Sequence, residues 1–124
     1  MNTKIIKELD KNPSYLKAVY NISKTCEETL AHDIRVELSL NEATPVDILE
    51  TLIKDDDVQI RLNVIKLKST SPKIVACAVR DLDDNVRLQA LKCQYVVEDD
   101  LIMLFQDKNA EVVALARKTL KSRL

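Results

Sequence analysis

The chain has 124 residues, a formal net charge of −1 and no glycine. A domain of this length buries about two thirds of the surface of its unfolded chain. Its near-neutral charge gives no global field that favours nucleic acid or a membrane. Tight hairpins and phosphate-binding loops lose their usual residue when glycine is absent, so strands are not expected.

The first residues are charged and lack the apolar core of a signal peptide, and no apolar run approaches the length of a membrane span. The 3 cysteines are odd in number and far apart, which indicates reduced thiols rather than a disulfide framework. We therefore expect a cytoplasmic protein with no membrane segment.

The N-terminal part, residues 1–28, is expected to form a cap. Apolar residues predict a short helix over residues 1–11 and a second helix through Tyr15, Leu16, Val19 and Ile22. The segment 23–30 is expected to form a further helix of a shortened unit. This part follows none of the periodicity seen later in the chain, as is typical of a terminal cap.

The rest of the sequence repeats itself at a shift of 26 residues. Columns that recur at this shift are Ile34, Ile60, Val86 and Val112; Leu38, Val64, Ala90 and Ala116; Leu49, Val75 and Leu101; Ile53, Val79 and Phe105; and Asp55, Asp81 and Asp107. Within one period the apolar spacing is helical, since Ile60, Val64 and Leu67 lie at i, i+4 and i+7. Each period thus predicts two short helices that bury their faces on the next pair.

The predicted repeats span residues 29–54, 55–80 and 81–106. Residues 107–124 supply one more first-type helix, which has no partner helix in the sequence. That end is expected to fray, to associate with a second copy, or to be capped by another element. We treat residues 1–124 as a single helical-repeat domain.

Polar residues mark where these helices begin. Asp57, and either Asp83 or Asp84, are expected N-caps of first helices, because their carboxylates accept unpaired backbone N–H groups. Thr44-Pro45 and Ser71-Pro72 each place a hydroxyl before a proline suited to the first helical turn. Both pairs are expected to begin second helices.

Three segments of this pattern resemble leucine-rich variant repeats and related HEAT-like repeats: D-D-x-V-x-I-R at 55–61, D-D-x-V-R at 83–87, and N-x-x-T-P-x-x-I-L-x-x-L at 41–52. The resemblance covers residues 29 to 120. It implies a right-handed α-solenoid whose second helices line the concave surface. It also implies that Arg35, Arg61 and Arg87 brace adjacent units.

No catalytic constellation is present, so we predict a non-enzymatic protein with no cofactor and no metal. His32 is the sole histidine and is expected to be a solvated or capping residue near an inter-helix turn. The acidic runs 55–57, 81–84 and 98–100 lie at expected helix starts, where negative charge is stabilising. We interpret the run 55–57 as capping together with pairing to Arg61.

The second helices become apolar toward the C-terminal end. The predicted partner-binding patch comprises Lys73, Cys77, Arg80, Ile102, Met103 and Gln106. Apolar side chains with a polar rim are typical of protein interfaces, and methionine adapts to irregular partners. We therefore expect a protein or peptide partner. The alternative is that Ile102 and Met103 pack under the C-terminal helix.

A second surface offers another function. Lys66, Lys92 and Lys118 recur at the same shift on the opposite, convex face and could follow a phosphate backbone. No aromatic residue lies among them to stack on bases, and lysines on a helix face are commonly solvated surface. Nucleic-acid binding is therefore the alternative prediction.

Overall fold

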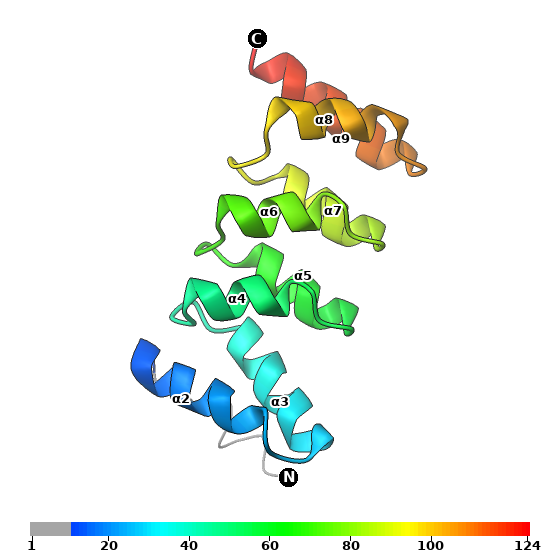
Figure 1. The fold of residues 1–124 in the computed structure, drawn as a ribbon. Helices are drawn as coiled ribbons and strands as arrows, with labels where there is room; N and C mark the ends of the chain where they lie inside the picture. The colour runs from blue at the N-terminus through cyan, green and yellow to red at the C-terminus, as the bar shows by residue number, and fades with distance from the viewer. Residues whose placement is uncertain (1–10) are drawn as a thin grey trace. The chain divides into compact units, whose positions relative to one another are not determined.

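The computed structural model describes residues 11–124, and every regular element in that range is a helix (Figure 1). The all-α prediction is confirmed. The helix expected over residues 1–11 lies almost entirely outside the described residues. The chain divides into two compact units, residues 1–70 and 71–124. The expectation of a single repeat domain concerns how these units sit together and stays a prediction.

The first unit is built around one long helix. Its helices are α2 (Pro13–Ser23), α3 (Glu28–Ser39), α4 (Val46–Leu52) and α5 (Val58–Lys66). Helix α3 packs against α2, α4 and α5. Leu16, Leu38 and Ile60 are fully buried in this unit, whereas Ile22 at the end of α2 is exposed.

The second unit also consists of short helices packed against one another. It contains α6 (Pro72–Ala78), α7 (Asp84–Leu91), α8 (Glu98–Met103) with the 3₁₀ turn η1 (Leu104–Gln106), and α9 (Ala110–Ser122). Helix α7 packs against α6 and α9, and α8 packs against α9 as well. None of the helices in residues 11–124 has the length and apolar character that crossing a membrane requires.

The repeating apolar columns form the core. Buried members are Ile34, Ile60, Val86 and Val112; Leu38, Val64, Ala90 and Ala116; Leu49, Val75 and Leu101; and Ile53 and Val79. Phe105, the last member of its column, is only half-buried, and its ring lies 5.4 Å from the guanidinium carbon of Arg117. The 26-residue shift therefore predicts burial at nearly every apolar position that it aligns.

The helix starts recur with the same period. Asp57, Asp83 and Asn109 are the N-caps of α5, α7 and α9, and each accepts the N–H of the residue two positions on at 2.8 Å. Asp83, not Asp84, is the cap in the second repeat. The aspartate two positions earlier accepts the N–H of each cap residue at 2.9–3.0 Å. The acidic runs 55–57 and 81–84 thus build tight turns that contain a helix cap.

The two proline pairs behave differently. Ser71 caps α6 as predicted, accepting the Ile74 N–H at 3.2 Å with Pro72 in the first turn. The prediction for Thr44 is wrong, because its buried hydroxyl donates to the Leu38 carbonyl at 2.7 Å. Pro45 is extended and precedes α4 as its N-cap residue.

The helix predicted over residues 23–30 is also wrong. Helix α2 continues to Ser23, and α3 already begins at Glu28. Ala31 is buried on the same face as Ile34 and Leu38, so the apolar periodicity of α3 extends one turn further toward the N-terminus than the sequence interpretation placed it. The intervening residues only connect the two helices.

Candidate protein-binding surface

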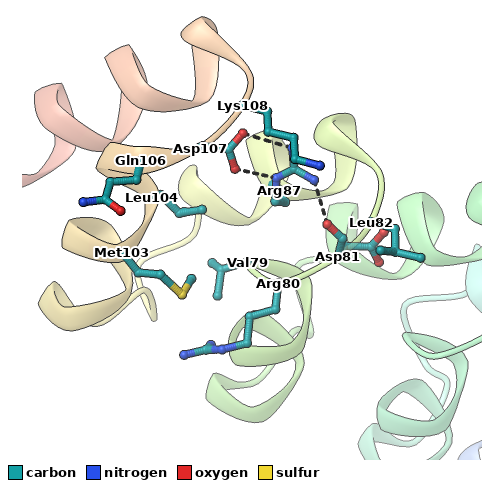
Figure 2. A pocket seen from close by; sticks show the side chains of 10 residues that line it. All are labelled: Val79, Arg80, Asp81, Leu82, Arg87, Met103, Leu104, Gln106, Asp107 and Lys108. Atoms are coloured by element: carbon teal, nitrogen blue, oxygen red, sulfur yellow. Dashed lines mark hydrogen bonds and ion pairs between the residues drawn. The ribbon is translucent and has the colours of Figure 1, made fainter.

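The second unit carries an open groove of about 380 Å³ (Figure 2). Its walls come from the connection between α6 and α7, from the end of α8 with η1, and from the start of the connection to α9. Arg80, Met103 and Gln106 of the predicted patch line this groove. Lys73 and Cys77 lie on α6 outside its lining, Lys73 exposed and Cys77 half-buried.

Two apolar side chains of the predicted patch face solvent, Met103 in the lining of the groove and Ile102 next to it on α8, outside the lining. Ile102 and Met103 on α8 are 52% and 42% exposed, so the alternative that they pack under the C-terminal helix is wrong. Figure 2 shows the Met103 side chain extending toward Val79 and Arg80. Leu101 of α8 and Leu104 of η1 are buried in the core, so Ile102 and Met103 lie on the outer side of α8.

Leu82 is a residue of this surface that the sequence interpretation missed. It lines the groove and is 98% exposed. The 26-residue shift contained a signal, because the equivalent residues, Asp56 and Lys108, are charged. Leu82 thus exposes an apolar side chain at a turn position where the neighbouring repeats carry a charged one, and it packs against nothing that would bury it.

Arg80 is held in place by a buried acid. Its Nη2 donates to Asp100 Oδ1 at 2.7 Å and its Nη1 to Asp100 Oδ2 at 3.3 Å, while Nη1 also donates to the Ala76 carbonyl at 2.9 Å. Asp100 lies in the first turn of α8, as the acidic run 98–100 predicts, and it also pairs with Arg80, which the sequence interpretation did not find. The hydrogen bonds to Asp100 raise the pKa of Arg80 above its ordinary value.

The repeating arginines make structural contacts. Arg35 Nε donates to Asp55 Oδ2 at 2.7 Å, and two periods later Arg87 Nε donates to Asp107 Oδ2 at 2.8 Å. Arg61 donates to the backbone carbonyls of Asp55 and Asp56. The predicted pairing of the run 55–57 with Arg61 is thus wrong for the Asp55 carboxylate, which pairs with Arg35 because α3 and α5 pack together.

His32 lies within α3 rather than near an inter-helix turn. Its Nε2 is 2.7 Å from Oδ2 of Asp57, the N-cap of α5. Two periods later, Asp84 accepts a hydrogen bond from Asn109, the N-cap of α9. His32 and Asp84 thus stand at equivalent positions, and each contacts the side chain of the N-cap residue of the following first-type helix. This recurrence favours a structural role for His32.

We expect acid to destabilise the fold by protonating two carboxylates at helix starts, those of Asp57 and Asp107. The hydrogen bond with His32, and next the hydrogen bond from the Gln59 N–H, hold the pKa of Asp57 below its ordinary value. Burial acts to raise the pKa of Asp107, but the hydrogen bonds from Arg87 and the Asn109 N–H outweigh it and the net pKa is again lowered. A carboxylate with a lowered pKa in the folded state stabilises fully above its unfolded pKa and loses that contribution as pH falls through the folded value.

Urea unfolding followed by circular dichroism at about pH 7, 5 and 3 checks this expectation. The free energy of unfolding should change little between the first two and fall at the third. Asp57→Asn should be less stable than the parent at neutral pH and lose less on acidification. An equal acid loss in parent and variant would contradict the assignment to Asp57.

The three lysines of the alternative surface are exposed. Lys92 is the C-cap of α7 and Lys118 lies on α9, two helices that pack together in the second unit. Lys66 is the last residue of α5 in the first unit. The structure therefore brings two of the three predicted phosphate-binding residues onto neighbouring helices.

Several ionisable side chains in residues 11–124 form ion pairs with one another. No group of three or more His, Cys, Asp or Glu side chains in that range is arranged to hold a metal ion. The sequence matches no protein-family model, and no curated protein and no solved structure resembles the chain at a significant level.

Proposed function

We propose that this chain is a non-enzymatic protein-binding module whose second unit takes a peptide segment of a partner in the groove beside α8. The supporting observation is the exposure of Leu82, Ile102 and Met103 at and beside one groove. Apolar side chains grouped at a hollow and rimmed by polar groups are typical of interaction sites. Covering them gains free energy in proportion to the apolar area removed from water.

The architecture that we propose is a HEAT-like or leucine-rich variant α-solenoid. The recurrence of local contacts supports it, because the Arg35–Asp55 contact of the first unit returns two periods later as Arg87–Asp107. The N-caps recur at every period as well. A chain whose repeats make the same contact to their neighbours is expected to stack them in one direction.

Met103→Glu tests the binding surface. It places a carboxylate within the apolar part of the groove, so a partner that covers Met103 must bury an unpaired charge. We expect affinity for the partner to fall at least about tenfold, with no change in the circular dichroism spectrum because Met103 is exposed. A tagged pull-down with and without nuclease finds the partner, and titration of the purified partner measures the affinity.

Ile22→Glu is the matched control, since it changes an exposed apolar residue in the first unit in the same way. It should leave binding unaltered. A nuclease-resistant partner retained equally by Met103→Glu would contradict the placement. Nuclease-sensitive partners that bind Met103→Glu as well as they bind the parent, with an affinity that falls steeply as salt rises, would favour the surface with Lys92 and Lys118 instead.

A further inference from the structure

The guanidinium of Arg80 keeps one edge open. A guanidinium has five N–H donors. Three hydrogen bonds go to Asp100 and to the Ala76 carbonyl, and they use both N–H groups of Nη1 and one of Nη2. Within the part of the chain that the structure describes, nothing accepts from Nε–H or from the second Nη2–H. These two groups point in parallel along one edge, which is the fork that binds a carboxylate with two hydrogen bonds.

The other arginine at this groove shows what fills such an edge. Arg87 donates from Nε and Nη2 to the two carboxylate oxygens of Asp107, at 2.8 and 3.0 Å. Its Nη1 donates to the Asp81 carbonyl at 2.7 Å. Figure 2 shows this closed cluster, with the Arg80 guanidinium lying apart from it. Arg87 is thus satisfied by its own chain, whereas Arg80, with its side chain 53% exposed, presents the same edge unoccupied.

The other charged side chains that line the groove are Asp81, Arg87, Asp107 and Lys108. Arg87 and Asp107 neutralise each other, and Asp100 neutralises Arg80. Lys108 also lines the groove and is exposed, and its ammonium acts on Asp107 only as a nearby charge. The lining carries the cations Arg80, Arg87 and Lys108 and the acids Asp81 and Asp107, and Asp100, paired with Arg80, is a third acid. The feature that favours a carboxylate is therefore the open donor edge of Arg80 rather than an excess of charge.

We propose, resting on the protein-binding function above, that the groove recognises a peptide segment with an aspartate or glutamate side chain close to a bulky apolar residue. The carboxylate accepts hydrogen bonds from Nε and Nη2 of Arg80. The apolar side chain packs against Met103. Asp100 is a positioning residue in this arrangement, since it fixes the plane of the guanidinium before the peptide arrives and so reduces the entropy lost on binding.

Peptide selection on the whole chain tests the proposal. A phage library of random peptides of about 12 residues, long enough to cross a groove of this size, is selected on the parent chain and in parallel on Met103→Glu. We expect peptides specific to the parent that carry Asp or Glu within a few positions of Leu, Ile, Phe or Met. A selected sequence is then synthesised with an amidated C-terminus, so that side chains supply its only carboxylates.

Isothermal titration of that peptide measures the contribution of Arg80. Changing its acid to the amide should weaken binding at least about tenfold. Arg80→Lys keeps the positive charge beside Asp100 but removes the fork, so it should weaken binding of the acidic peptide. In this variant the change of the acid to the amide should alter the affinity very little. Arg80→Gln combined with Asp100→Asn should do the same without leaving a buried acid unpaired. Lys121→Gln, an exposed change on α9 outside the groove, should have little effect.

The outcomes separate this inference from the proposed function. Peptides that need Met103 but show no acid preference and bind Arg80→Lys normally would overturn the Arg80 fork and leave the protein-binding groove standing. Failure to select any peptide that depends on Met103 would overturn both. Thermal unfolding of each variant confirms that lost binding is not lost folding.

Discussion

Asp107→Ala is expected to lower the free energy of unfolding by about 3–5 kcal/mol, because it removes one partner of a largely buried ion pair. The Asp107 side chain is 7% exposed and holds both Nε and Nη2 of Arg87. It also accepts the N–H of Asn109, the N-cap of α9. The change therefore leaves Arg87 inside the fold without its counter-charge and weakens the turn that begins the last helix.

Urea unfolding followed by far-ultraviolet circular dichroism measures this loss, since the chain has no tryptophan to report on it. Asp99→Ala is the control, because Asp99 is an exposed acid on α8 and its removal should change stability by no more than about 0.5 kcal/mol. Equal losses for the two variants would show that the Arg87 pair contributes nothing beyond a surface charge.

Leu101→Ala is expected to cost about 2–5 kcal/mol through lost burial and the cavity that remains. Leu101 is fully buried on α8, at the position that Leu49 and Val75 occupy in the earlier repeats. The neighbouring residue provides the comparison: Ile102 is half exposed, so Ile102→Ala should cost less than about 1 kcal/mol.

The same two variants separate stability from binding. Partner affinity should fall in Ile102→Ala, whose side chain belongs to the proposed surface, at nearly unchanged stability. The fraction of Leu101→Ala that remains folded should bind the partner with the same affinity as the parent. The interpretation of α8 as a helix with one core face and one binding face would fail if Ile102→Ala unfolded the protein as readily as Leu101→Ala.

Local chemistry explains which predictions succeeded. The caps Asp57, Asp83 and Ser71 were found from sequence because a side-chain oxygen two or three residues before a helical N–H is enough to make the contact. Asn109 follows the same rule one period later. The buried columns were found because the 3.6-residue period of a helix decides which residues share a face.

Predictions failed where a distant residue competes for a side chain. Thr44 was expected to cap the helix that follows it, but the Leu38 carbonyl six residues earlier takes its hydroxyl. The place of Asp100 at a helix start is confirmed, but its pairing with Arg80 was missed because Arg80 lies 20 residues earlier in the chain. His32 was placed near a turn, and only the packing of α3 on α5 brings it to Asp57.

The sequence by itself therefore determined the helical class, the period, the core positions and most helix starts, because these depend on spacing within one or two turns of chain. It also predicted Arg80, Met103 and Gln106 as members of one surface. Only the tertiary structure decided that Ile102 and Met103 face solvent, that Leu82 lines the same groove as Met103, and that Arg80 keeps one donor edge open. Exposure and unfilled hydrogen bonds are decided by what the rest of the fold covers, and spacing along the chain does not carry that information.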